Sequence, residues 1–265
     1  MTKKNSPTSF GDIRSLLYER PVKASTWHKL ARSLYFFEEP GALREEVLPY
    51  CAETIREWPE DLERAAPNHW LFTDEGEEQG ALHPGLALAT HVVVYKPPTE
   101  GFVERLLDVW RFGLLESLEF THPQTPEAIF EKLLDADIWG SLKELRYNAH
   151  VSDGLLRRFF ESPWRAQLER IDLSKTGIDD TMMEFIAKQD NFEKLEWLSL
   201  RGNEITHESI DHLLGMESLG NLVSLDLTDN AFEREDEELF QQEPTSLSME
   251  VLMEAWEEYY WDAFE

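Results

Sequence analysis

The sequence predicts an α/β protein in which short parallel strands and helices alternate as a solenoid, between a small helical domain and a C-terminal helical cap. Three observations carry this prediction: a leucine pattern recurs at a fixed interval, apolar residues before it have helical spacing, and an acidic amphipathic segment follows it. With 265 residues, 42% of them hydrophobic, the chain is long enough to bury a core in each part.

The recurring pattern is clearest from Leu195 to Ile205. Leu198 and Leu200 alternate as on a short strand whose buried face they share. Asn203 can bond backbone groups that the following bend leaves unpaired. The same pattern returns at steps of 26 or 27 residues, at Leu115 and Leu118, Leu142 and Leu145, Leu168 and Ile171, and Leu222 and Leu225. Five copies at one interval predict stacked parallel strands.

The residues between the strands predict a helix in each unit. Thr181 and Glu184 have the spacing of a capping box, and Thr206 can cap the helix of the next unit. Each repeat is therefore expected to consist of a strand, a bend, a helix and a segment that returns to the next strand.

Residues from about 115 to 232 resemble leucine-rich repeats of the ribonuclease-inhibitor type, on the run L-x-x-L-x-L-x-x-N-x-I from Leu195 to Ile205. The resemblance implies a horseshoe with a parallel sheet on its concave side and helices on its convex side. It covers a little under half of the chain, and only Asn203 and Asn230 fill the asparagine position. Such a motif is specific for the fold and nearly silent about the ligand.

The residues before the repeats predict a helical domain. Residues 1–8 are expected to be a disordered tail, and residues 9–85 a helical domain that ends in an acidic linker. Apolar residues at helical spacing follow Ser9 and Ser25, each a candidate helix cap, and a third apolar stripe begins at Leu43.

Residues 86–240 are expected to hold about six repeats, the first of them degenerate. The strongest β-forming run, His91 to Tyr95, begins 27 residues before Leu118, which is one repeat interval. Residues 241–265 are expected to form an acidic capping helix, because a terminal repeat exposes an apolar side that needs a polar cover.

The order of these parts is similar to that of some bacterial repeat-companion proteins, in which a small helical domain precedes imperfect leucine-rich repeats. The matching residues are Arg32 to Tyr35, followed by Glu38 and Glu39, and the run Gly101 to Arg105. In that family the Gly-Phe-Val-Glu-Arg run enters the first strand, whereas here the β-forming run precedes it. The resemblance implies a bacterial source.

Charge and cysteine content narrow the class of partner and the compartment. A formal net charge of −28 argues against nucleic acid and anionic membranes as direct partners, because phosphates would be repelled. It is compatible with a basic protein partner and with solubility alone. Cys51 is the only cysteine, and neither a signal peptide nor a membrane-spanning apolar run is visible. We expect a soluble, cytoplasmic monomer.

Motifs that carry catalysis are missing from the sequence. His207 and Glu208 begin an H-E-x-x-H pattern, but the second histidine is His212, one place too late for a shared helix face. No phosphate-binding or nucleophile-elbow motif occurs. Cys51 has no nearby cysteine and lies on an apolar helical stripe. We therefore predict no catalytic residue, metal or cofactor.

The side chains that flank the buried leucines of each strand are expected on the concave face. Arg146, Arg170 and Arg201 are placed there in near-equivalent positions, together with Trp197. Arginine and tryptophan are enriched at binding hot spots. The predicted partner-binding residues are Arg146, Asn148, Arg170, Asp172, Trp197, Ser199, Arg201 and Asp226.

These observations predict a non-catalytic module that binds a protein partner on the concave leucine-rich-repeat face. A second surface is predicted at Trp256, Tyr260 and Trp261, where a detachable aromatic and acidic segment would dock on a partner. Two alternatives remain: an acidic inhibitor that imitates nucleic acid for a basic protein, and a Cys51-dependent transferase.

Overall fold

In the computed structural model the chain divides into two compact units. Unit 1 consists of Met1–Val93 and Thr99–Ser117, and unit 2 of Val94–Pro98 and Leu118–Glu265. The structure describes residues 8–71, 82–98, 101–110, 113–136, 140–189, 192–215, 221–232 and 250–252.

Unit 1 begins with helices, as predicted from the apolar spacing. Its elements are α1 (Phe10–Leu17), α2 (Ala24–Tyr35), α3 (Pro40–Ala42), the π-helical turn η1 (Leu43–Val47), α4 (Leu48–Ile55), the 3₁₀ turns η2 (Asn68–Trp70) and η3 (Pro84–Leu88), and α5 (Phe102–Val109). Two buried tryptophans tie the segments together through their indole N–H groups. Trp27 donates to the carbonyl of Ala65 at 2.8 Å, and Trp58 donates to the carbonyl of Leu17 at 3.3 Å.

The first strand, β1 (His91–Val94), is covered on one edge by an extended segment of unit 1. Ala65 forms a parallel bridge with His91, and the buried Arg64 donates its Nε–H to the carbonyl of Leu88 at 3.1 Å. Such a cover protects the strand edge from pairing with another chain. Residues 86–93 belong to unit 1 together with this segment.

The remaining strands are β2 (Ser117–Phe120), β3 (Glu144–Tyr147), β4 (Arg170–Asp172), β5 (Trp197–Ser199), β6 (Ser224–Asp226) and β7 (Glu250–Leu252). The strands are hydrogen-bonded in sequence order from β1 to β7. From β3 onward each neighbouring pair is parallel, and Leu145, Ile171, Leu198 and Leu225 stand opposite one another. The predicted repeat of parallel strands in an α/β fold is confirmed.

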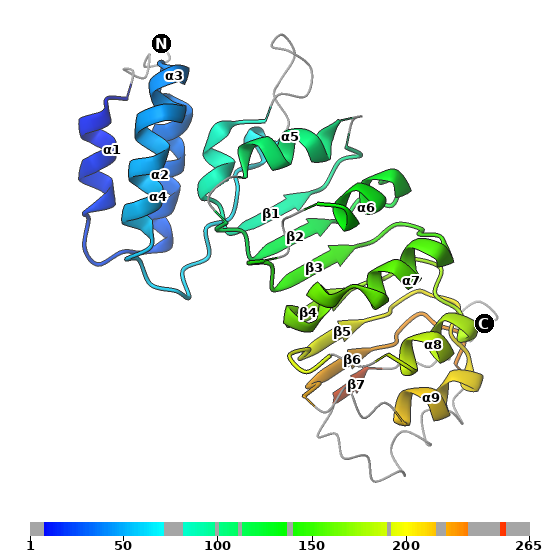
Figure 1. Ribbon diagram of the computed structural model, residues 1–265. Helices are drawn as coiled ribbons and strands as arrows, with labels where there is room; N and C mark the ends of the chain where they lie inside the picture. Colours follow the sequence, from blue (N-terminus) through cyan, green and yellow to red (C-terminus); the bar gives the residue numbers. More distant parts are fainter. Residues whose placement is uncertain are drawn as a thin grey trace, which may run out of the picture. The chain divides into compact units, whose positions relative to one another are not determined.

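Helices α6 (Glu127–Leu134), α7 (Asp153–Glu161), α8 (Asp180–Ala187) and α9 (Ile210–Leu214) lie along one side of the strands of unit 2 (Figure 1). Between strands and helices the core is filled by aromatic rings that contact one another from repeat to repeat. The neighbouring ring centroids are 4.8 to 6.1 Å apart. The rings belong to Phe120, Tyr147, Phe130, Phe159, Phe160 and Phe192. Each repeat therefore packs against the next, as solenoid stability requires.

Two of the predicted helix caps are confirmed and two are wrong. Ser9 caps α1, and Thr206 accepts a hydrogen bond at the start of the 3₁₀ turn η5 (His207–Ser209) that leads into α9. Ser25 lies inside the first turn of α2, which begins one residue earlier. Thr181 does not cap α8 because Asp179 does: the Asp179 carboxylate accepts from the Met182 N–H at 2.8 Å. An Asp side chain two residues upstream competes well for that role.

A carboxylate at the start of α8 also joins two repeats. Asp180 accepts from the backbone N–H and the hydroxyl of Thr206, at 2.9 and 2.7 Å, and from the hydroxyl of Ser209. Burial acts to raise the pKa of Asp180, but these hydrogen bonds outweigh it and lower that pKa. Glu127, at the start of α6, accepts from the Ser152 N–H in the following repeat in the same way.

Asp180→Ala is expected to lower the free energy of unfolding by about 1–2 kcal/mol at pH 7, because it removes charge-assisted hydrogen bonds between repeats. Since folding lowers the pKa of Asp180, its contribution is complete above the unfolded pKa and is lost as pH falls through the folded one. Urea denaturation at pH 7 and pH 3 should show the variant and the wild type converging in acid. Asp153→Ala, at the matching position of α7, is the control, and an equal loss in both variants would contradict the inter-repeat role.

The predicted C-terminal capping helix is wrong for the part that the structure describes. Glu250–Leu252 form β7, which pairs parallel with β6, with Val251 opposite Leu225. The edge of β6 offers unpaired backbone groups, and a β-branched residue such as Val251 favours extended backbone. The rest of the predicted cap, including Trp256, Tyr260 and Trp261, lies outside the described residues.

Candidate functional site

Side chains that flank the buried leucines form what we call the strand face, which consists of rows running across β3 to β6. The first row holds Glu144, Arg170, Trp197 and Ser224. The second row holds Arg146, Asp172, Ser199 and Asp226. The prediction that the three arginines occupy equivalent places is wrong. Arg170 precedes its buried Ile171, whereas Arg146 follows Leu145, and Arg201 lies two residues beyond the second-row Ser199.

Polar contacts cross the strand face from β2 to β5. Arg146 Nη1 lies 3.1 Å from Glu119 Oε2, and Arg146 Nε lies 2.8 Å from Asp172 Oδ2. Asp172 Oδ1 accepts from the N–H and the hydroxyl of Ser174, at 2.9 and 2.5 Å. The hydroxyls of Ser174 and Ser199 are 2.9 Å apart. Asp172 and Ser199 are only 7% and 2% exposed, so these contacts hold the face together more than they offer it to a partner.

The same arrangement recurs at β6. The Ser199 hydroxyl donates to Asp226 Oδ2 at 3.4 Å, and Asp226 Oδ1 accepts from the N–H and the hydroxyl of Thr228, at 3.0 and 2.7 Å. Asp172 and Asp226 each bond the N–H two residues on, which stabilises the turn that follows the strand. Asp172, Ser199 and Asp226 therefore bond the protein's own turns and neighbouring strands, and Arg146 pairs with carboxylates of the two strands beside it.

Arg170 and Trp197 stand side by side in the first row of the strand face. The Arg170 guanidinium carbon lies 4.9 Å from the centroid of the half-buried Trp197 ring, a cation–π distance. Arg170 Nε also lies 3.7 Å from Glu144 Oε1, and the Arg170 side chain is 48% exposed. We call these two residues the Arg170–Trp197 pair. It presents an indole and a guanidinium together on a rigid sheet.

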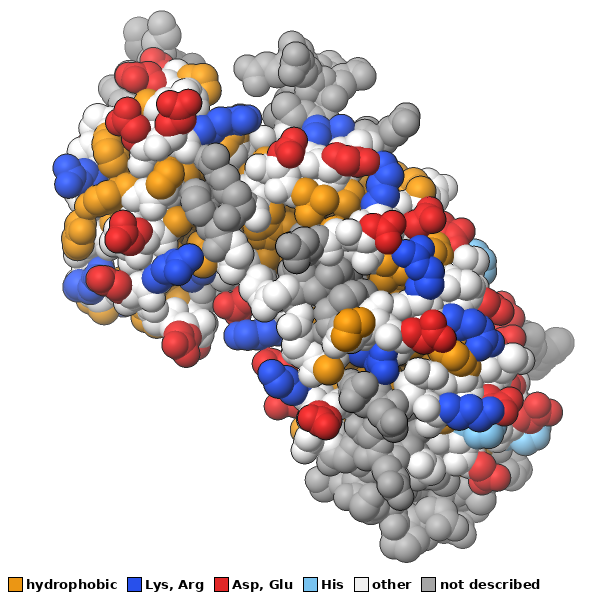
Figure 2. All heavy atoms as spheres, in the orientation of Figure 1, with side chains coloured by type: hydrophobic (Ala, Val, Ile, Leu, Met, Phe, Trp, Pro, Cys, Tyr) orange, Lys and Arg blue, Asp and Glu red, His pale blue; other side chains and the backbone are white. Residues whose placement is uncertain are grey.

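The other predicted residues lie near the turns. Arg201 Nε lies 2.8 Å from Asp229 Oδ2, and both side chains are half exposed. Asn148 is half-buried. Figure 2 shows Lys and Arg side chains interspersed with Asp and Glu on the visible face of the repeats. Each of the three predicted arginines likewise lies beside a carboxylate of this chain.

The repeat interval could have revealed those carboxylates. Glu119 lies 27 residues before Arg146, and Glu144 lies 26 residues before Arg170. Because one interval brings residues side by side on neighbouring strands, a charge and its opposite at that spacing predict an ion pair.

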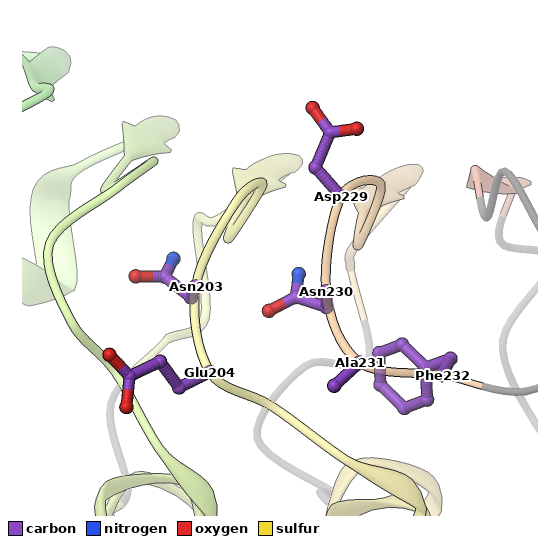
Figure 3. Close-up of a pocket in the computed structure, with 6 residues that line it drawn as sticks. All are labelled: Asn203, Glu204, Asp229, Asn230, Ala231 and Phe232. Atoms are coloured by element: carbon purple, nitrogen blue, oxygen red, sulfur yellow. The ribbon is translucent and has the colours of Figure 1, made fainter. Parts of the chain in front are cut away.

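A surface hollow of about 470 Å³ lies beside the turns after β5 and β6 (Figure 3). It is lined by Asn203, Glu204, Asp229, Asn230, Ala231 and Phe232. In Figure 3 the amides of Asn203 and Asn230 point the same way from equivalent turns, and the Asp229 carboxylate points away from them. Both amides are bonded to backbone groups, so their role beside this hollow is structural.

The amide of Asn203 has the role predicted for the asparagine position. Its oxygen accepts from the N–H groups of Thr176, Gly177 and Ile178, at 2.9 to 3.1 Å, and its nitrogen donates to the carbonyls of Leu173 and Leu200. The asparagine thus closes the preceding turn as well as its own.

Cys51, the residue of the transferase alternative, belongs to the core. The thiol is fully buried in α4, and burial raises its pKa to about 12, which keeps it protonated at neutral pH. No group of three or more His, Cys, Asp or Glu side chains in the described part of the chain could hold a metal ion. No helix among the described residues is long and apolar enough to cross a membrane.

Parallel strands in register, a helix after the strand and an asparagine that bonds two successive turns define a leucine-rich-repeat-like fold. No protein-family model matches the chain, and no curated protein matches it.

Among solved structures, the chain is similar to a Bacteroides fragilis protein, with 19% identity and a TM-score of 0.44 over 52% of this chain and 41% of that one. It is also similar to an internalin from Listeria monocytogenes, with 18% identity and a TM-score of 0.35 over 64% of this chain and 51% of that one. At these TM-scores neither match supports an inference about function.

Proposed function

We propose that this chain is a non-catalytic protein-interaction module that binds a protein partner through its strand face. The observation that carries the proposal is the Arg170–Trp197 pair, an aromatic ring and a cation accessible together on a sheet. Tryptophan and arginine dominate binding hot spots because they combine large apolar area with directed hydrogen bonds. The surrounding polar contacts fix the sheet before binding, which reduces the entropy lost on association.

The finer features of the proposal follow the repeat pattern and the charge. We propose that the repeats are of the ribonuclease-inhibitor type, with the strand face on the concave side, and that the protein acts as a monomer in the cytoplasm. The net charge of −28 favours a basic partner, because long-range attraction speeds the encounter of oppositely charged proteins.

Trp197→Ala and Arg170→Ala are each expected to weaken partner binding at least about tenfold, or about 1.4 kcal/mol. The matched control is Arg158→Ala. The Arg158 side chain is 45% exposed and pairs with Asp135 at 2.7 Å, but it lies on α7. Affinity capture from the native host followed by mass spectrometry identifies the partner, and titration with the purified partner measures each affinity. Equal affinity for all three variants would refute the strand-face site.

Salt dependence separates this proposal from the acidic-decoy alternative. Binding through the partly buried indole of Trp197 should persist in high salt, because apolar contact is not screened. A decoy that works through net charge alone would lose its affinity steeply over the same range. Reversing the charge of Arg146 would not test partner binding at the strand face. Arg146 pairs with Glu119 and Asp172 within the sheet, so the change would disturb the sheet itself.

A further inference from the structure

Unit 1 carries a groove of about 360 Å³ along the C-terminal half of α2, far in sequence from the strand face. One wall comes from α2 and its cap residue, and the other from the segment that leads into η2. It is lined by His28, Ala31, Arg32, Tyr35, Phe36, Pro67 and His69. We call it the α2 groove.

The α2 groove has exposed aromatic rings in its lining. Tyr35 is 45% exposed and Phe36 is 36% exposed. The Tyr35 ring meets the rings of Phe36 and His69 edge to face, with centroids 5.2 and 4.4 Å away. Clustered exposed apolar surface of this kind marks interaction sites on soluble proteins.

The rings of the groove rest on a packed interior and are therefore held in place. The Tyr35 ring lies 5.8 Å from that of His83, which stacks on the fully buried Trp70 at 4.8 Å. A side chain at Gly85 would come within 2.7 Å of the Trp70 ring and 2.8 Å of His83 Nδ1. A larger residue at position 85 would therefore displace the stack of His83 and Trp70 that lies behind Tyr35.

The groove also differs in charge from the chain as a whole. Its lining includes Arg32, His28 and His69, and no lining residue is acidic, although the chain has a net charge of −28. Burial, together with the nearby charges of His69 and Arg44, lowers the pKa of His83 to about 4. The neutral His83 thus serves as an aromatic support, while the guanidinium of Arg32 stands at the surface.

We propose that the α2 groove binds a peptide segment of a partner protein that carries both acidic and aromatic side chains. Carboxylates complement the guanidinium of Arg32, and rings complement Tyr35 and Phe36. A peptide fits better than a small molecule, because five of the seven lining residues are exposed, whereas small-molecule sites enclose most of their ligand. This proposal does not depend on the strand face.

The test uses the full chain and an array of short immobilised peptides in which acidic content and aromatic content vary independently. Peptides rich in both should retain the wild-type protein most strongly. The double variant Tyr35→Ala with Phe36→Ala should lose the preference for rings, and Arg32→Ala should lose the preference for carboxylates. Each loss should weaken the best peptides at least about tenfold.

Control variants lie elsewhere on unit 1. Tyr18→Ala removes a ring that is 58% exposed, and Arg56→Ala removes an exposed cation, so both should keep the wild-type preference. Because all altered side chains are exposed, far-ultraviolet circular dichroism should show every variant folded. The proposal is overturned if no peptide is retained, if retention ignores either property, or if the groove variants and the controls behave alike.

Discussion

Replacing Asn203 with alanine is expected to lower the free energy of unfolding by about 3–5 kcal/mol. The side chain is buried, and its amide bonds three backbone N–H groups and two carbonyls from two successive turns. Alanine would leave those groups buried without partners, and each unsatisfied group costs about 1–3 kcal/mol, reduced wherever water enters.

Urea denaturation of the variant measures this effect, with two related variants for comparison. Asn230→Ala should cost less, because the Asn230 oxygen accepts from one backbone N–H, that of Ile205. Asn221→Ala should cost about 1 kcal/mol or less, because its exposed amide makes one hydrogen bond, to the carbonyl of Glu193. If Asn203→Ala were no more destabilising than Asn221→Ala, the amide could not be what joins the turns.

Phe159→Ala is expected to cost about 3–5 kcal/mol through the cavity that it leaves between repeats. Phe159 is fully buried in α7, and its ring lies 5.7 Å from that of Phe130 in α6 and 5.0 Å from that of Phe160. Since repeats are stabilised by contacts with their neighbours, loss of this ring weakens the interface between two repeats.

The size of the replacement side chain should set the effect at this position. Phe159→Leu keeps most of the apolar volume and should cost less than about 1.5 kcal/mol. Hydrogen exchange should show faster opening of α6 and α7 in the alanine variant than in the leucine variant. Similar exchange in both variants would mean that the interface does not depend on the ring.

The repeats could be predicted because their signal is periodic and is set by burial. Leu145, Ile171, Leu198 and Leu225 follow one another at a fixed step, and the structure places them opposite one another. The end of the sheet could not be predicted, because the helical spacing around Leu252 is a local property. The strand Glu250–Leu252 depends on the edge of β6, a contact that no local pattern records.

The candidate site could be predicted only in part from the sequence, for a similar reason. Alternation along each strand correctly places Arg170 and Trp197 on the same face as Asp172. Alternation does not show which side chains form hydrogen bonds within the protein. Asp172 and Ser199 are buried because of contacts between neighbouring strands and turns. What remains accessible is therefore a smaller site than the row of residues suggests.

Hydroxyl-radical footprinting with and without the captured partner tests the strand-face proposal most directly. Oxidation of Trp197 is expected to slow several-fold in the complex, because a hot-spot residue is desolvated on binding. Tyr18, exposed on unit 1, should report the unchanged radical dose. If Trp197 were oxidised equally fast in the complex, the partner would bind elsewhere and the Arg170–Trp197 pair would not be its site.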